Sequence, residues 1–147
     1  MSGETQQRIA SPCLCNALRQ ASRAVTRLYD EELRSVGLRT TQYSLLRYLK
    51  HFGSVRQRDL GAATSLDETT LTRTLRPLID AGWVTADPGE DRREKLVALS
   101  SAGSAKLAKA LPAWERAQER MRARLSKTKW SELLALLPDL VRLADDA

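Results

Sequence analysis

Two short helical patterns separated by only two residues constrain this chain more than any other feature of its sequence. The first pattern covers 56–64 and the second covers 67–81, and only Ser65 and Leu66 lie between them. Two helices joined by so tight a turn are typical of a helix-turn-helix unit. We therefore expect a helix-turn-helix over 56–81.

The pattern changes from helical to strand-like spacing directly after Gly82. Residues 83–87 and 94–99 are rich in strand-forming side chains, and 88–93 are charged and turn-forming. This predicts a β-hairpin with an exposed tip, and a helix-turn-helix followed by such a hairpin is a winged helix. The expected fold class is mainly α with a small β-hairpin wing, and the winged helix-turn-helix lobe is expected to span 38–100.

The second helix of this unit has one apolar face and one polar face. At about 100° per residue, Leu75, Leu78 and Ile79 fall on the same side as Leu71, and hydroxyl and charged side chains fall opposite. Short hydroxyl side chains let a backbone approach DNA, and arginines grip guanine edges or phosphates. The alternative is an ordinary amphipathic helix with a solvated polar face. The candidate DNA contacts on this helix are Thr69, Thr70, Thr72, Arg73 and Arg76.

Two residues set the expected geometry of this helix. Asp67 is a good N-cap, since its carboxylate can accept from the free amides of the first turn. Pro77 lacks the amide that would bond to the carbonyl of Arg73, so we expect a mild bend there.

Two arginines occupy the expected tip of the hairpin. Arg92 and Arg93 directly follow Glu90 and Asp91 in a segment too polar to be core. Arginines on a protruding wing can enter a minor groove, where narrow A/T tracts concentrate negative potential. We expect Arg92 and Arg93 to contact DNA; the alternative is that they are solvated or paired with neighbouring acids.

Long amphipathic patterns flank this lobe on both sides. The first covers 11–36 and ends at Gly37, after which Thr40 or Thr41 is expected to cap a helix closed by 51–53. Ser100 or Ser101 is expected to cap a long helix, in which Pro112 should either cause a bend or remove a backbone hydrogen bond, and a final helix follows. The apolar positions are Leu14, Leu18, Ala21, Val25, Leu28, Leu33 and Val36, then Leu107, Leu111, Trp114, Met121 and Leu125, then Trp130, Leu133, Leu134, Leu137, Val141 and Ala144.

These stripes exceed what one small lobe can cover. We expect 11–36 and 101–145 to be dimerisation helices that interlock two subunits in a homodimer, within a single domain of 1–147. The alternative is that the stripes pack within one chain.

The charge balance favours a polyanionic partner only weakly. The chain has a formal net charge of +6, but residues 54–100 carry 7 basic and 8 acidic side chains. Recognition of DNA must therefore depend on a few placed arginines rather than on a broad positive patch.

Other classes of protein lack support in the sequence. The single His51 with Cys13 and Cys15 offers too few ligands for a zinc site, and no glycine-rich phosphate loop or catalytic cluster is recognisable. We expect no enzyme activity, no metal and no cofactor. The start of the chain lacks the apolar core of a signal peptide, and the longest apolar run, 133–138, is far short of a membrane span. A cytoplasmic protein with no membrane partner is expected.

Several motifs resemble those of MarR-family regulators. The segment 91–103 resembles that family's wing signature, in which an aspartate and an arginine precede a strand that ends in leucine, a hydroxyl residue and glycine. Residues 71–78 and 81–84 resemble its recognition helix and the entry to its wing. The similarity includes Gly37-Leu38 and Gln42-Tyr43, although for the last pair we expect capping and core packing rather than a ligand role.

The resemblance implies a triangular homodimer whose two winged lobes bind a pseudo-palindromic operator in double-stranded DNA. It also implies a repressor that is released by a small aromatic ligand or by an oxidant.

The first helix also resembles the peroxide-sensing OhrR branch, whose reactive cysteine is hydrogen-bonded by tyrosines. The resemblance places Cys15 and Tyr29 in such a site, whereas Thr40 and Arg19 stand where aromatic residues are expected. Along one helix Cys15 and Tyr29 would be about 21 Å apart, so we expect Cys15 to be partly buried beside Tyr29 of a second subunit, with Arg19 nearby.

Other roles for Cys15 stay open. It is either a small packing residue, a sensor, or the nucleophile of a thiol-based peroxide-reactive redox protein. Cys13 lies about 200° around the helix from Cys15 and is not expected to pair with it.

Overall fold

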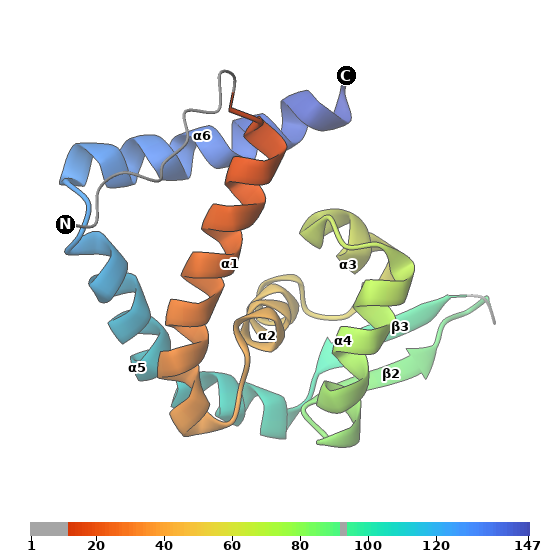
Figure 1. The fold of residues 1–147 in the computed structure, drawn as a ribbon. Coiled ribbons are helices and arrows are strands. Elements are labelled where there is room, and N and C mark those ends of the chain that lie inside the picture. Colours follow the sequence, from red (N-terminus) through yellow and green to blue (C-terminus); the bar gives the residue numbers. More distant parts are fainter. Residues whose placement is uncertain (1–11, 92–93) are drawn as a thin grey trace.

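The computed structural model describes residues 12–91 and 94–147. The elements within residues 40–99 form a winged lobe, and the long helices within 14–33 and 101–145 form helical arms (Figure 1). In chain order they are α1 (Leu14–Leu33), the 3₁₀ helix η1 (Arg34–Val36), α2 (Thr40–Phe52), β1 (Val55–Arg56), α3 (Gln57–Thr64), α4 (Glu68–Asp80), β2 (Val84–Pro88), β3 (Lys95–Leu99), α5 (Ser101–Arg122) and α6 (Lys127–Asp145). The mainly helical fold class with a hairpin wing is confirmed.

The core of the lobe is built from leucines at helical spacing. Leu71, Leu75 and Leu78 lie one turn apart on α4 and are all buried against α2 and the sheet. Burial of each such side chain stabilises the fold by about 1.5–3 kcal/mol. Ile79, which the sequence places on the same face, is 37% exposed because it lies at the edge of that face. The remaining fully buried large side chains include Leu33, Tyr43, Leu45, Leu46, Leu49, Leu60 and Val97.

The predicted hairpin is present and belongs to a three-stranded antiparallel sheet. The strand order is β1-β3-β2, with Val84 opposite Leu99 and Pro88 opposite Lys95. The third strand, β1, pairs Val55 with Val97, so the predicted helix 56–64 begins one residue late, at Gln57. A two-residue strand is too short to produce a period in the sequence, which is why it was not predicted.

The junction between α1 and α2 corrects one expected cap. Gly37 ends the 3₁₀ segment with a φ of 72°, as glycine does in left-handed turns. Thr40 does not cap α2 but is its first residue, and Arg39 is the N-cap. The carboxylate of Asp30 on α1 accepts from both the amide and the hydroxyl of Thr40, at 2.7 Å each. A side chain from the neighbouring helix thus replaces the local cap.

Gln42 and Tyr43 act structurally, as predicted. The Oε1 atom of Gln42 accepts from the Arg39 amide at 2.9 Å, and Tyr43 is 2% exposed and stacks on Trp114 of α5.

The face of α5 that packs on the rest of the chain is made of small residues. Ala110, Ala113 and Ala117 are fully buried, whereas Leu111, part of the predicted stripe, is 43% exposed. Small side chains allow close approach of helices, and α1 and α5 are extensively in contact. Ser100 caps α5 by accepting from the Gly103 amide at 3.0 Å. The helix continues through Pro112.

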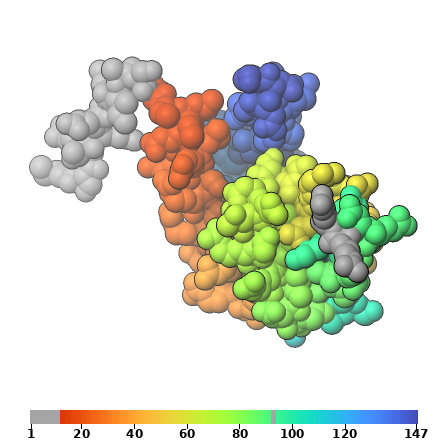
Figure 2. Space-filling model, turned by 90° about the vertical axis from the view of Figure 1, so that its right-hand side faces the viewer, coloured from red at the N-terminus to blue at the C-terminus, as the bar shows by residue number. Residues whose placement is uncertain are grey.

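The arms leave much apolar surface uncovered. The space-filling view shows the first half of α1 and the end of α6 projecting beyond the winged lobe (Figure 2). In α6, which is described in full, no side chain is buried. Within the described residues, no helix combines the length and apolar character that a membrane crossing requires.

Candidate nucleic-acid interface

The turn between α3 and α4 brings these helices unusually close. Ser65 adopts a left-handed conformation with φ of 56° and ends α3. A Cβ on Gly61 would lie 3.3 Å from the carbonyl oxygen of Leu66 and 3.4 Å from a methyl group of Leu71. This tight packing fixes the position of α4 relative to α3 and confirms the predicted helix-turn-helix.

Asp67 organises the first turn of α4. Its carboxylate accepts from the amide of Thr70 at 2.8 Å and from the hydroxyl of Thr70 at 2.9 Å. These hydrogen bonds hold the pKa of the Asp67 carboxyl below its usual value. The predicted N-cap is confirmed. Thr70, predicted as a DNA contact, is engaged in this cap.

The other candidate residues of α4 share one exposed face. Thr69, Thr72, Arg73 and Arg76 are all exposed, and they line a surface hollow along the helix. Glu68, Pro77 and Asp80 complete its lining. Pro77 does not end the helix, which continues to Asp80. The polar face predicted from the sequence is thus gathered opposite the buried leucines.

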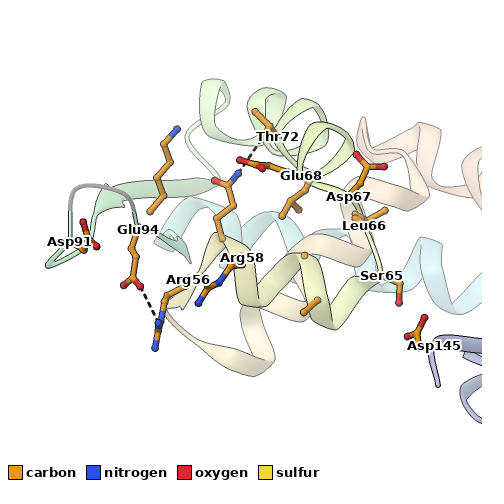
Figure 3. A pocket seen from close by; sticks show the side chains of 15 residues that line it. Arg56, Arg58, Ser65, Leu66, Asp67, Glu68, Thr72, Asp91, Glu94 and Asp145 are labelled. Carbon is orange, nitrogen blue, oxygen red and sulfur yellow. Dashed lines mark hydrogen bonds and ion pairs between the residues drawn. The ribbon is translucent and has the colours of Figure 1, made fainter. Parts of the chain in front are cut away.

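A second hollow lies between α3, the start of α4 and the outer end of the hairpin (Figure 3). It has a volume of about 890 Å³ and is lined by basic side chains, Arg56, Arg58 and Lys95, and by acidic ones that include Glu68 and Glu94. Thr72 borders both hollows. The polar surface is therefore continuous from α4 to the wing.

The outer end of the hairpin, next to its turn, is tied to the lobe by ionic contacts. The Arg56 guanidinium lies 3.1 Å from a Glu94 carboxylate oxygen (Figure 3). It also lies 3.5 Å from a carboxylate oxygen of Asp59. The Glu94 amide also donates to the Asp91 carbonyl at 2.9 Å. The candidate wing contacts Arg92 and Arg93 lie outside the described residues.

The candidate sensing residues occupy different parts of α1. Cys15 and Arg19 are exposed near its start, so the single chain does not bury Cys15, and its predicted partial burial between two subunits stays a prediction. Cys15 is exposed because this end of α1 extends beyond the lobe. Tyr29 lies near the other end, where its hydroxyl donates to Gln118 of α5 and burial raises its pKa. Contact of Cys15 with Tyr29 of a second subunit stays a prediction.

Contacts at this surface, and between the helices α1 and α5 that adjoin the lobe, could not be predicted from the sequence. Gln57 donates from Nε2 to the Thr72 hydroxyl at 3.1 Å. Arg56 pairs with Glu94, 38 residues away. On the far side of the lobe, Glu32 of α1 pairs with Arg116 and Arg120 of α5, and the hydrogen bond from Arg116 is the main cause of the lowered pKa of Glu32. Such pairs depend on the tertiary fold, so charge patterning along the chain cannot reveal them.

Comparison with known proteins places this architecture in a family. Residues 36–94 match the family model described as MarR family. A curated relative, the Bacillus subtilis protein described as the uncharacterised HTH-type transcriptional regulator YwoH, is 34% identical over 87 residues, which cover 59% of this chain. The matched region spans 64% of that relative's length.

Solved structures agree over almost the whole chain. The M. tuberculosis transcriptional regulator MosR, in complex with DNA, has a TM-score of 0.83 and 31% identity, and the match covers 92% of this chain and 98% of that one. A probable transcriptional regulator from Pseudomonas aeruginosa has a TM-score of 0.77 and 30% identity over 86% of this chain and 96% of that one. A cysteine variant of E. coli MarR with operator DNA, at 23% identity and a TM-score of 0.77 over 86% of this chain and 92% of that one, shows the shared fold. The family and these structural neighbours are transcriptional regulators rather than enzymes. This chain belongs to the MarR family of transcriptional regulators.

Proposed function

We propose that the protein is a homodimeric repressor that recognises a specific sequence in double-stranded DNA through α4 and the wing. The observation that carries this proposal is the exposed face of α4. There Thr69, Thr72, Arg73 and Arg76 point away from a leucine core that holds the helix rigidly. A helix in the major groove needs such a face, with arginines for guanine O6 and N7 and short side chains for close approach. Thr70 is the least available of the proposed contacts, since Asp67 accepts its hydroxyl hydrogen.

The hairpin supports the same proposal. It extends from the lobe beside α4 (Figure 1), and the Arg56–Glu94 ion pair ties its outer end to β1. We assign Arg92 and Arg93 at its tip to the minor groove or the phosphates flanking the α4 site. A similar regulator has been solved in complex with DNA, which supports DNA binding by this fold.

The uncovered apolar surface of the arms supports a homodimer. Leu14 on α1 and Leu133, Leu134, Leu136, Leu137, Val141 and Leu143 on α6 are all at least 36% exposed. Contiguous apolar patches of this kind mark interfaces in soluble proteins. A two-fold dimer pairs identical surfaces and presents two α4 helices, so the operator is proposed to be a pseudo-palindrome.

Selection of bound fragments from random duplex DNA tests the proposed function. We expect an enriched near-palindrome whose half-sites are about one helical turn, ~10 bp, apart. Retention of random DNA with no enriched sequence would contradict sequence-specific recognition.

Sedimentation equilibrium tests the dimer. The wild-type chain is expected to be a dimer at micromolar concentration, and Leu134→Asp with Val141→Asp is expected to shift it toward monomer. The matched control is Thr128→Asp with Ser131→Asp, which adds the same two negative charges at exposed polar positions near the start of α6. A monomeric wild type, or a control as dissociated as the variant of Leu134 and Val141, would defeat the assignment.

Release of the operator is proposed to follow binding of a small aromatic ligand or oxidation of Cys15. Cys15 is exposed, so peroxides can reach its sulfur in the single chain. The alternative function, a thiol-based peroxide-reactive redox protein, rests on the same exposure. We propose a cytoplasmic location, because a protein that binds DNA must share a compartment with it.

Operator affinity before and after one equivalent of organic hydroperoxide separates these routes. An oxidant switch predicts weaker binding by the wild type and no change in Cys15→Ser. Unchanged affinity despite mass-confirmed oxidation at Cys15 excludes the switch, and a parallel titration with a phenolic acid then tests the ligand route. Turnover of many equivalents of peroxide would instead support the redox-protein alternative.

A further inference from the structure

One hydrogen bond crosses from α3 to the exposed face of α4. The Nε2 atom of Gln57 lies 3.1 Å from the hydroxyl oxygen of Thr72, and the contact is visible at Thr72 in Figure 3. Gln57 is the first residue of α3 and is half-buried, whereas Thr72 is exposed. The contact therefore lies at the edge of the surface assigned to DNA.

Both ends of this contact are held by the core. Leu60 anchors α3 and Leu71 anchors α4, and both are buried, while Gly61 permits their close packing. A side chain reaching across two such fixed helices has few alternative positions. The Thr72 oxygen is therefore held with one lone pair occupied by the Gln57 amide.

The neighbouring threonines use their hydroxyls differently. The hydroxyl hydrogens of Thr70, Thr74 and Thr64 are donated within the lobe, to the Asp67 carboxylate, the Thr70 carbonyl and the Leu60 carbonyl respectively. At Thr72 the hydroxyl is instead the acceptor from Gln57. The hydroxyl hydrogen of Thr72 is thus left to point outward, toward the DNA groove in which α4 is proposed to lie.

We propose that Gln57 is a positioning residue that makes Thr72 a hydrogen-bond donor toward DNA and thereby sets base preference at one position of each half-site. The proposal rests on the proposed function and deepens it. A donor in the major groove is matched by guanine O6 or N7, adenine N7 or thymine O4. It is mismatched by the N4 amino group of cytosine, which is itself a donor. Cytosine is therefore disfavoured at the base that Thr72 faces.

Two substitutions of Gln57 separate an effect on the orientation of the Thr72 hydroxyl from an effect on the overall affinity for DNA. In Gln57→Glu the carboxylate accepts the Thr72 hydrogen, so Thr72 offers only lone pairs and preference shifts toward cytosine N4 or adenine N6 at that position. In Gln57→Met the chain has similar length but no hydrogen bond, so the hydroxyl rotates freely and preference there relaxes. A single hydrogen bond predicts changes of about threefold to tenfold in relative affinity.

The readout is base preference at every position of the selected operator, measured by competition among single-base variants. The added charge of Gln57→Glu lowers affinity for all sequences, but this uniform loss does not alter the ranking of bases. Thermal unfolding of each variant checks that the lobe is folded. Repeating Gln57→Glu in a Thr72→Val background removes the hydroxyl and is expected to abolish the change in ranking.

The outcomes distinguish the proposal from the function on which it rests. A changed ranking at one position in both Gln57 variants, lost in the Thr72→Val background, supports the proposal. A wild-type ranking in both variants, or a change that persists in the Thr72→Val background, overturns it and leaves sequence-specific binding intact. If wild-type protein selects no sequence, the proposed function itself fails.

Discussion

At the scale of single residues, Asp67 links the stability of α4 to pH. Its carboxylate accepts the amide and the hydroxyl of Thr70, and these bonds lower its pKa in the folded protein. A lowered folded-state pKa means that the folded state binds protons less readily than the unfolded state. The stabilisation is therefore present above the unfolded pKa and is lost as the pH falls through the folded pKa.

We expect the difference in melting temperature between wild type and Asp67→Ala to be largest near neutral pH. It should shrink as the pH falls below about 4, where the carboxyl of the unfolded state takes up a proton, and it is lost as the pH falls through the lower pKa of the folded state. Thermal unfolding followed by circular dichroism from pH 7 to pH 3 measures this. Asp80→Ala, at the exposed far end of the same helix, is the control. A difference that grows on acidification would contradict the assigned cap.

Gly103 is a position at which one added carbon atom, the Cβ of any other residue, would disturb the packing. A Cβ there would overlap the carbonyl oxygen of Trp83 and a methyl group of Leu99, at the joint between the wing and α5. Gly103→Ala is expected to lower the free energy of unfolding by about 1–3 kcal/mol or more, since backbone atoms would have to move. Denaturant titration measures the change, with Ser101→Ala, exposed on the same helix, as the control. Equal stability of the two variants would refute the close approach.

At the scale of elements, local signals predicted most boundaries. Asp67 and Ser100 cap the helices that they precede, and Gly37 ends the first helical segment, because caps depend on the hydrogen bonds of a single turn. The strand β1 and the Asp30 contact at Thr40 depend on partners elsewhere in the chain. The sequence could not reveal these, since neither has a period or a neighbouring partner.

The same limit applies to the candidate site. Helical spacing placed Thr69, Thr72, Arg73 and Arg76 on one face without knowledge of the fold. The contact of Gln57 with Thr72 depends on the angle between α3 and α4, which cannot be predicted from the residue spacing within one helix.

The Arg56–Glu94 ion pair ties the outer end of the wing to β1. The Arg56–Glu94 pair is exposed and contributes less than about 1 kcal/mol to global stability. We expect Glu94→Gln to leave the melting temperature nearly unchanged while accelerating amide exchange at Gly89 and Glu94, whose amides donate to the carbonyls of Glu94 and Asp91 respectively. Asp59→Asn, which removes the other partner of Arg56, serves as the control. Identical exchange in both variants would show that the pair does not hold the wing.

At the scale of the whole molecule, the lobe and the arms differ in how much apolar surface they bury within one chain. The lobe buries its leucines within one chain, whereas α6 buries none of its side chains. The alanine stripe of α5 and the ion pairs of Glu32 join α1 to α5, so the arms are connected to the lobe through one continuous packed unit. A change at the proposed dimer interface is therefore expected to alter the spacing of the two α4 helices on DNA.

The central claim is that the exposed face of α4 enters the major groove through Arg73. Protection of guanine N7 from dimethyl sulfate tests this directly, because N7 lies in the major groove. On the selected operator, saturating wild-type protein is expected to protect guanines in two patches about 10 bp apart. Arg73→Ala at saturation is expected to leave the guanines faced by that residue reactive. Wild-type complexes whose guanines all stay reactive, or the same protection with Arg73→Ala, would contradict the account.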